Sequence, residues 1–384
     1  MKLLYISTLS FADCDFPLIR EYQRKGIDVT YLILLPPFAL KSTLVDIKKQ
    51  ISYSGIFLAT EYMEFKKYYS YMDMSKVYVA NRTGKNVLSV SYWKCKRELN
   101  RFVKNGKFDI IHCDYMLGST IKSLSVLTKK WVQTIHDPFP HSGENGSKKN
   151  RIYQKTISYS NYLFLLNETQ KTDFCNYYGI PENRVFINRL GIYDNIQSFI
   201  KPNQRVKKNN ILFFGRISPY KGIEYLCEAI TKVREAVPDV TLTIAGGGKF
   251  YFDIEPYQKL EYVDIRNHYI GMEELAGLLA QCDLTVCPYT DATQSGVIMT
   301  SYSLGKPVIA TNVGGLPEMI EQNKTGVIVP PCDSDVLATV IIELLKDKEK
   351  LQKMSDYINN EYGTGEKSWN KIAEKYIELY TSIL

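Results

Sequence analysis

The sequence predicts a two-domain α/β protein in which each domain is a doubly wound, Rossmann-like parallel sheet. Continuous apolar runs of strand length alternate with amphipathic helical stretches, and they do so in two series separated near residues 198–210. Such runs are typical of parallel strands that are covered on both faces, and repeated strand–helix alternation builds this kind of sheet. The 384 residues also suffice for two domains of about 180–200 residues each.

The front series contains five expected strands with helices between them. The strands are residues 2–7, 28–34, 109–114, 131–136 and 162–166, and the helices include 15–25, 91–105, 117–129 and 168–178. The N-terminal stretch faintly resembles a secretory signal, but its apolar run is short and no cleavage site follows, so we interpret it as the first strand. No stretch approaches about 20 uninterrupted apolar residues, so we expect no membrane-spanning helix.

A second series begins after the segment IKPNQRVKKNN, whose proline, asparagines and basic cluster indicate a domain boundary. Its expected strands are residues 211–216, 240–248, 268–271, 284–289, 307–311 and 325–330. The chain closes with an amphipathic helix in which Trp369, Ile372 and Tyr376 lie on or near one face. Ligands bind beyond the carboxyl ends of strands in such sheets, so we expect a site between the two domains.

Charge and cysteine content limit the classes of partner. The net charge of +7 is divided into +11 over residues 1–200 and −4 over the remainder, which suggests anionic partners for the front half. No zinc-finger, basic-zipper or RNA-binding motif is present, so we expect no nucleic acid. The eight cysteines lie far apart with no CxxC pair, and only four histidines occur. We therefore expect reduced thiols, a cytoplasmic protein and no metal site.

Two strand–helix connections carry the pattern of an anion site. In FFGRISPYKGIEYL, Arg216 and Lys221 lie in a loop between a strand and a helix, where a guanidinium, an ammonium and a helix N-terminus suit a diphosphate. In PYTDATQSGV a helix is expected to start near Gly296. Four backbone N–H groups at that start should be free to face an anion, namely those of Ser295, Gly296, Val297 and Ile298.

Taken together, these motifs resemble the donor domain of the family 4 glycosyltransferases. The GR…KG pair is followed by SGVIM, LGKPVIAT, GGLPE and VPP in order, over about residues 205–345. The resemblance implies a retaining, nucleotide-sugar-dependent enzyme of the GT-B fold, with two Rossmann-like domains facing a central cleft. It also implies that the last helix crosses back to the N-terminal domain. We therefore expect an acceptor-binding domain of residues 1–198 plus 366–384, and a donor-binding domain of residues 199–365.

The resemblance also assigns roles to individual residues. Arg216 and Lys221 match the pair that neutralises the donor diphosphate, and His136 matches a histidine that faces the donor sugar. Three positions match a glycine turn that lines the donor cleft: Gly246, Gly247 and Gly248. Tyr269 and Ile270 match the stretch whose backbone reads the base.

One departure from the family pattern concerns its two glutamates, which lie eight positions apart. Thr293 and Ser301 occupy those positions here, and the sequence resembles a variant branch in which Gln294 hydrogen-bonds the sugar. The usual Gly-Gly of the first loop is replaced by STLSFADCD, which leaves Ser10, Asp137 and His141 as acceptor-side candidates. The DxD sequence within that segment is most simply a helix N-cap.

We therefore expect a retaining hexosyltransferase that uses a UDP- or GDP-sugar without a metal cofactor. Its acceptor would be a hydroxyl of a glycan or lipid-linked glycan, in bacterial surface polysaccharide or glycoconjugate synthesis. A nucleotide-sugar epimerase on the same fold and a non-catalytic nucleotide-sugar-binding subunit are the alternatives. Residues 91–107 and 61–72 mix aromatic and basic side chains, which favours either ordinary packing or contact with anionic lipid at the inner face of the cell membrane.

Overall fold

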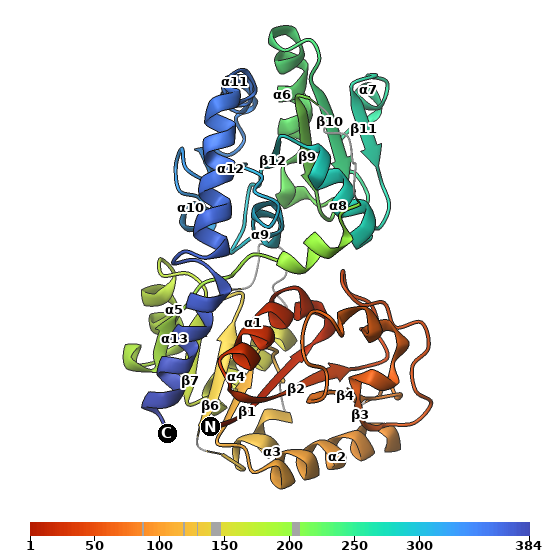
Figure 1. Ribbon diagram of the computed structural model, residues 1–384, viewed down its shortest axis with the longest axis vertical. Helices are drawn as coiled ribbons and strands as arrows, with labels where there is room; N and C mark the ends of the chain where they lie inside the picture. The colour runs from red at the N-terminus through yellow and green to blue at the C-terminus, as the bar shows by residue number, and fades with distance from the viewer. Residues whose placement is uncertain (87, 118–119, 129, 140–146, 202–207) are drawn as a thin grey trace. The chain divides into compact units, whose positions relative to one another are not determined.

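A computed structural model of the protein shows two compact α/β units (Figure 1). The structure describes residues 1–384 except 87, 118–119, 129, 140–146 and 202–207. The first unit comprises residues 1–190 and 369–384, and the second comprises residues 191–368. Each unit is built on a largely parallel sheet flanked by helices, and the C-terminal helix belongs to the first unit. The predicted fold class is confirmed in these respects.

An eight-stranded sheet forms the first unit. In spatial order its strands are β3 (Gly55–Leu58), β4 (Val77–Asn81), β2 (Asp28–Leu35), β1 (Lys2–Thr8), β5 (Ile110–Cys113), β6 (Trp131–Ile135), β7 (Tyr162–Leu165) and β8 (Val185–Ile187). All neighbours are parallel except β3 and β4. The five predicted strands are present, whereas β3, β4 and β8 were not predicted. The edge strands β3 and β8 are short and only partly buried, so they lack the long apolar run of the inner strands.

Helices cover both faces of this sheet. They are α1 (Ala12–Arg24), α2 (Val90–Gly106), α3 (Ile121–Ser125), α4 (Ser147–Tyr159), α5 (Lys171–Tyr178) and α13 (Trp369–Ser382). Because strand side chains alternate between faces, Leu4 and Ile6 of β1 join a core with α2 and α3. Tyr5 points to the other face, where its ring contacts Tyr22 of α1. Tyr22 in turn hydrogen-bonds Tyr380 of α13 (2.9 Å), which ties the C-terminal helix to this unit.

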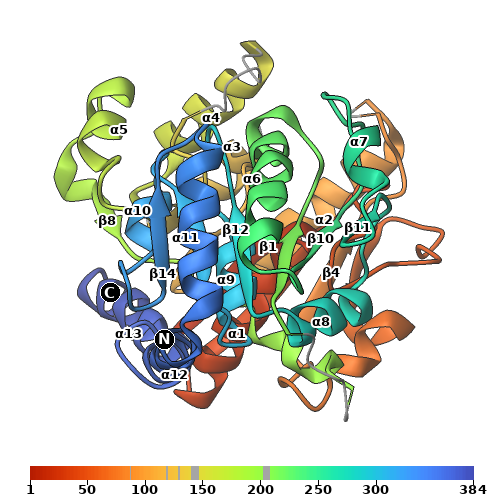
Figure 2. The same cartoon turned by 90° about the horizontal axis from the view of Figure 1, so that it is seen from above.

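The second unit contains a six-stranded parallel sheet. The strand order is β11 (Val263–Arg266), β10 (Thr241–Ala245), β9 (Asn210–Phe214), β12 (Leu284–Cys287), β13 (Val308–Thr311) and β14 (Gly326–Val329). Its helices are α6 (Ile223–Ala236), α7 (Glu255–Gln258), α8 (Met272–Gln281), α9 (Gly296–Tyr302), α10 (Leu316–Met319), α11 (Ser334–Lys346) and α12 (Lys348–Gly363). Helices α6 and α11 pack side by side (Figure 2).

One predicted strand of the second unit was wrong. Residues 268–271 are not a strand, and the strand of that region is β11 at Val263–Arg266. β11 is an edge strand that pairs only with β10, and of its residues only Val263 is buried. Its sequence therefore alternates apolar and charged residues, whereas the apolar pair Tyr269–Ile270 simply leads into α8.

The boundary between the units lies eight residues earlier than predicted, after Leu190 instead of residue 198. The short 3-10 helix Asp194–Phe199 belongs to the second unit. Gln197 donates a hydrogen bond from Nε2 to the backbone oxygen of Ser303 (2.6 Å), and the backbone N–H of Tyr193 bonds the oxygen of Met299 (3.4 Å). These contacts with the end of α9 outweigh the linker-like composition further along the chain.

The two stretches considered for membrane contact are mainly packed inside the first unit. In α2, Leu99 and Val103 are each 4% exposed and belong to the core beneath the sheet, while Phe102 packs on Tyr78. In residues 61–72, the buried side chains are Tyr62, Phe65, Tyr68 and Met72. Ordinary packing therefore explains the buried apolar side chains of both stretches, whereas Met63, Tyr69 and Trp93 are exposed.

Candidate functional site

The loop between β9 and α6 holds two cations close together. Arg216 is exposed, whereas Lys221 is only 9% exposed and its Nζ lies 3.6 Å from the ring centroid of Tyr289. Burial, together with the nearby charge of Arg216, lowers the pKa of Lys221 to about 8. Within the described residues, neither cation has an acidic partner. This loop therefore carries positive charge that no described carboxylate neutralises.

A glycine turn supports that loop. After β10 the chain passes through Gly246 at φ 156°, and a Cβ atom there would lie 1.8 Å from the backbone oxygen of Gly215. The N–H of Ile217 donates to the oxygen of Gly247 (3.1 Å). Because these contacts flank Arg216 on both sides, a side chain at position 246 would displace the segment that carries the guanidinium. The predicted turn 246–248 thus lies directly beside the cationic loop.

The segment that precedes α9 presents Gln294. Its backbone is held by close packing, since Gly314 (φ 51°) approaches so near that a Cβ atom would lie 1.5 Å from the oxygen of Ala292. The Gln294 side chain is half-buried, and its Nε2 atom is buried without a hydrogen-bond partner in the described structure. A buried amide N–H without a partner costs free energy. This residue is therefore equipped to donate to a ligand.

Two of the four backbone N–H groups predicted to be free at the start of α9 are engaged. Ser295 donates its N–H to Sδ of Met319 (3.4 Å), and Ile298 donates to the oxygen of Ser295 (3.1 Å) because the first turn closes tightly. The N–H groups of Gly296 and Val297 have no acceptor within the described residues. The anion-facing set predicted from the sequence is therefore reduced to two groups.

The prediction that the side chain of Ser301 binds the donor was wrong. It is 0% exposed, its hydroxyl accepts from Oγ1 of Thr285 (2.9 Å) and it donates to the oxygen of Val297 (2.8 Å). These bonds join α9 to β12, so the side chain serves packing. Thr293 is 7% exposed and already has an intramolecular partner.

The stretch after β11 that was predicted to meet the nucleotide base is open to solvent. Tyr269 is 51% exposed and has a contact of its own. The backbone of Ile270 makes no hydrogen bond with the described residues. Its N–H and C=O remain available, as the predicted role requires.

In the first unit, His136 pairs with Asp114. His136 directly follows β6 and Asp114 directly follows β5, so these neighbouring strands bring the two residues to the same edge of the sheet. His136 Nε2 lies 2.9 Å from Asp114 Oδ2, and the imidazole ring stacks on the ring of Phe11 (4.2 Å between centroids). Burial by itself would lower the pKa of His136, but the charge and hydrogen bond of Asp114 outweigh it and raise this pKa. The imidazolium form is therefore favoured.

A second carboxyl group lies beside this pair. Asp15 of α1 is 1% exposed and accepts a hydrogen bond from the hydroxyl of Tyr31 (2.9 Å). Burial and the neighbouring Asp114 raise the pKa of Asp15. Burial by itself would raise the pKa of Asp114. The charge and hydrogen bond of His136 outweigh burial, so the pKa of Asp114 is lowered. We infer that Asp15 keeps its proton while Asp114 is the carboxylate.

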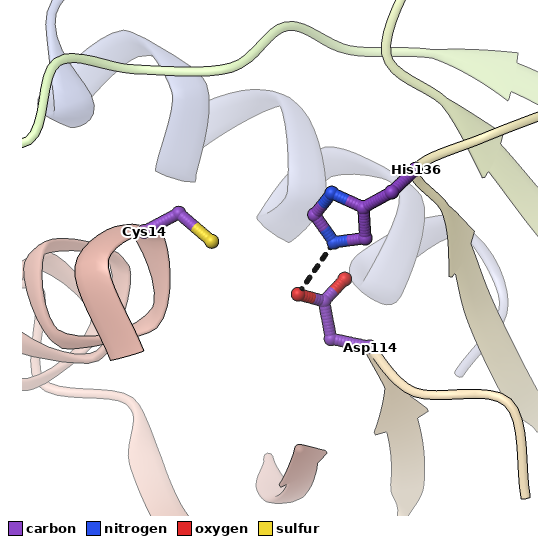
Figure 3. A group of neighbouring side chains, drawn as sticks. All are labelled: Cys14, Asp114 and His136. Atoms are coloured by element: carbon purple, nitrogen blue, oxygen red, sulfur yellow. Dashed lines mark hydrogen bonds and ion pairs between the residues drawn. The ribbon is translucent and has the colours of Figure 1, made fainter. Parts of the chain in front are cut away.

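Cys14 completes a group that sequence spacing did not reveal. Its Sγ lies within 4.8 Å of a ligand atom of both Asp114 and His136, and it points toward the pair (Figure 3). These three residue types can hold a metal ion. However, burial and the nearby carboxylates raise the pKa of the Cys14 thiol, which donates to the oxygen of Phe11 (3.1 Å). The arrangement therefore fits a protonated thiol beside an ion pair.

The remaining predictions for the first unit have mixed outcomes. Ser10 is exposed in the 3-10 helix Leu9–Phe11 that follows β1, and Asp137 is partly exposed with a partner of its own. His141 lies outside the described residues. The prediction that the Asp13–Asp15 segment caps the helix N-terminus was wrong, because α1 already begins at Ala12 and its N-cap is Phe11.

Asp114 was the functional candidate that the sequence reasoning missed. Its signal was available, since it stands in DIIHCDY directly after an expected strand, where ligand-facing residues occur. His112, two residues before it, has a structural role. It is wholly buried, bonds Thr134 Oγ1 (2.7 Å) and the hydroxyl of Tyr380, and its pKa is lowered to about 4 by burial.

Comparisons with known proteins show similarity to glycosyltransferases. Residues 208–347 match the family model described as glycosyl transferases group 1. An uncharacterized glycosyltransferase of Methanocaldococcus jannaschii is 28% identical over 300 residues, which cover 71% of this chain and 75% of the relative. A GDP-mannose-dependent alpha-(1-6)-phosphatidylinositol monomannoside mannosyltransferase of Mycobacterium tuberculosis is 29% identical over 186 residues, covering 45% of this chain and 47% of that protein.

Solved structures support the fold. The Anabaena protein HepE in complex with UDP aligns over 100% of both chains with a TM-score of 0.67 at 17% identity. At this level of identity the likeness concerns the fold. Among the described residues, no helix is both long and apolar enough to cross a membrane.

Proposed function

The chain belongs to the group 1 glycosyltransferases of the GT-B fold, and we propose that it moves a hexose-type sugar from a UDP- or GDP-sugar to an acceptor hydroxyl with retention of configuration. The observation that carries the donor assignment is the cationic loop of the second unit, where Arg216 and Lys221 lack a described acidic partner. Two unpaired cations beside a helix start suit the two phosphates of such a donor.

In this proposal the second unit stabilises the leaving group. As the bond to the sugar breaks, negative charge grows on the diphosphate, and Arg216 and Lys221 oppose it with fixed positive charge. The free N–H groups of Gly296 and Val297 add donors on the same side of the sheet. The Nε2 atom of Gln294 donates to a hydroxyl of the sugar, in place of the carboxylate that the family usually carries. The backbone of Ile270 meets the base.

The first unit supplies the acceptor side and His136. The imidazolium, held by Asp114 and Phe11, can donate a hydrogen bond to a sugar hydroxyl through its second nitrogen. No side chain here is required as a covalent nucleophile, because in the family mechanism the leaving phosphate takes the acceptor proton on the face that it leaves. We propose that transfer needs no metal, since the protein supplies the positive charge.

For the acceptor we propose a glycan or lipid-linked glycan of a bacterial surface polysaccharide or glycoconjugate. The Mycobacterium relative is named for a phosphatidylinositol monomannoside, which is an acceptor of this chemical type. We also propose peripheral contact with anionic membrane through exposed apolar side chains of the first unit, which include Phe38 (67% exposed), Val90 (85%) and Trp93 (56%). Basic residues adjoin them, and Lys96 lies over the Trp93 ring (5.2 Å).

A thermal-shift panel of UDP, GDP, ADP and their sugars tests the donor assignment. A ligand at 100 times its Kd adds about 2.7 kcal/mol of stability, so the right diphosphate should raise the Tm clearly. The Arg216→Ala/Lys221→Met double variant should lose that shift. Absence of a shift with every diphosphate would overturn the proposal.

Transfer is then followed with the donor that binds and with a glycolipid extract as acceptor. Nucleoside diphosphate should be released only when acceptor is present, and the product should keep the anomeric configuration of the donor by NMR. Conversion of donor without acceptor would identify an epimerase instead. Binding without release would identify a non-catalytic subunit.

A further inference from the structure

The first unit contains a cavity of about 550 Å³ that the sequence motifs did not indicate. It lies at the carboxyl ends of β1, β2, β4 and β5, where Thr8, Leu35 and Tyr115 contribute to its wall, and α2 and α4 close its sides. This position is where ligands bind in parallel α/β sheets, and the volume is within the range of about 300–1,000 Å³ that is usual for small-molecule sites.

The inner wall of the cavity is apolar. Leu35, Ala80 and Leu99 line it while being no more than 4% exposed, and Cys95 is 8% exposed. Ala80, Cys95 and Leu99 also belong to the core between the sheet and α2. The cavity is therefore an extension of the core that opens outward. Such a wall offers few hydrogen bonds to a soluble glycan but suits a hydrocarbon chain.

The charged residues of the cavity are all cations. Arg82, Lys96, Arg151 and Lys155 line it, and no acidic residue does. None of the four has an acidic partner within the described residues. Charge of one sign around an apolar wall indicates a ligand with one anionic group and one hydrocarbon part.

Polar atoms at the cavity also lack partners. The Thr8 hydroxyl and Nε of Arg82 are buried and make no hydrogen bond in the described structure. The Arg82 guanidinium is positioned by two rings, since it lies 5.2 Å from the centroid of Phe38 and 5.6 Å from that of Tyr92. A positioned guanidinium suits bidentate binding of a phosphate, and the unpaired hydroxyl can bond the same oxygens.

We propose that this cavity binds the hydrocarbon chain and phosphate of a lipid phosphate, so that the acceptor is lipid-linked. This inference rests on the proposed function, because the cavity by itself defines a ligand and not a reaction. Its wall adjoins the His136 pair along the chain: Tyr115 follows Asp114, and Thr8 lies three residues before Phe11. The exposed Phe38 at the rim gives a lipid an apolar path to the cavity.

The test is isothermal titration of the full chain, without any nucleotide sugar, with decyl phosphate below its micelle concentration. Butyl phosphate, inorganic phosphate and decyltrimethylammonium are titrated in parallel. Burial of each methylene strengthens binding about four-fold, so decyl phosphate should bind at least 50-fold more tightly than butyl phosphate. The decyl cation should not bind measurably. Equal affinity for decyl and butyl phosphate would overturn the proposal by reducing the cavity to a free-phosphate site.

Variants locate the site. Lys96→Ala should weaken decyl phosphate binding at least five-fold, whereas Lys104→Ala, an exposed lysine further along α2, should leave it unchanged. Ile152→Trp should fill the cavity and abolish binding, and Leu117→Trp serves as a second filling variant if the first is misfolded by circular dichroism. Binding that survives a folded filling variant would place the lipid elsewhere and overturn the proposal.

The outcome is distinguishable from failure of the proposed function. Decyl phosphate binding with no diphosphate binding or transfer would reject the glycosyltransferase mechanism and keep the lipid phosphate site. Diphosphate binding and transfer to a soluble glycan, without decyl phosphate binding, would reject only the lipid phosphate site.

Discussion

The cationic loop of the second unit and the His136 pair of the first unit hold charge in opposite ways. In the second unit Arg216 and Lys221 have no acidic partner within the described residues, and burial lowers the pKa of the lysine. In the first unit His136 and Asp114 neutralise each other, and Asp15 keeps its proton. Unpaired buried charge destabilises an empty site, so the loop that carries Lys221 gains stability when an anion binds. The side chains of the His136 pair already hold each other in place without a ligand.

The largest effect should come from removing the unpaired cations. Arg216→Ala or Lys221→Met should each lower kcat by about 30- to 1,000-fold, because a contact of about 2–4 kcal/mol with the departing diphosphate is lost. Methionine preserves the packing of the lysine stem on Tyr289. Lys249→Ala, an exposed lysine of the same unit, should behave as wild type. Normal rates in both variants would contradict the role of this loop.

Gln294→Ala should reduce kcat/KM by roughly 5- to 150-fold, corresponding to about 1–3 kcal/mol for an unpaired sugar hydroxyl. Binding of the free nucleoside diphosphate, measured by titration, should barely change. Gln294→Glu should also lose activity, because an ionised carboxylate cannot donate the hydrogen bond that Nε2 supplies. The exposed Gln258→Ala is the control. Loss of diphosphate binding in Gln294→Ala would instead identify a residue that supports the phosphates.

Diphosphate affinity should depend on the protonation of Lys221. With a pKa of about 8 in the empty site, the lysine is charged at pH 7 and increasingly neutral above pH 8. Affinity for the diphosphate should therefore fall as pH rises, approaching ten-fold per pH unit at its steepest. Lys221→Arg should flatten this profile because arginine stays protonated. A wild-type profile that is flat from pH 7 to 9.5 would show that Lys221 does not contact the anion.

The self-neutralised pair of the first unit can be tested by NMR titration of His136. Asp114→Asn removes the charge that raises the pKa of His136, so burial should then bring that pKa below its ordinary 6.5. Asp15→Asn replaces a carboxyl group that is already neutral and should change it little. Equal shifts in the two variants would mean that both carboxyl groups are ionised.

The smallest expected effect is that of a chelator. If Cys14, Asp114 and His136 form an ion pair beside a thiol, transfer should continue in excess EDTA, and Cys14→Ser should not sensitise the enzyme to it. Loss of activity that manganese or magnesium restores would show that a cation takes part. If Cys14→Ser no longer regained activity when manganese or magnesium was added, that cation would be placed in this group.

The sequence by itself determined what is encoded locally. Most inner strands are buried on both faces, so their apolar runs are visible without a structure, although the inner strand β4 was missed. Arg216 and Lys221 belong to one strand–loop–helix connection, and five residues of separation suffice to bring them together. The edge strands and the boundary after Leu190 were misjudged because their form depends on what covers them.

Only the tertiary structure decided which distant residues meet. Phe11, Asp114 and His136 come together because β1, β5 and β6 are neighbours in the sheet, and strand order is not readable from periodicity. The burial of Ser301 and the lipid-sized cavity follow in the same way from packing between elements. Residues that are close in sequence, such as Arg216 and Lys221, can be recognised as a site from the sequence. Burial and the pairing of distant residues depend on how the strands assemble into the sheet.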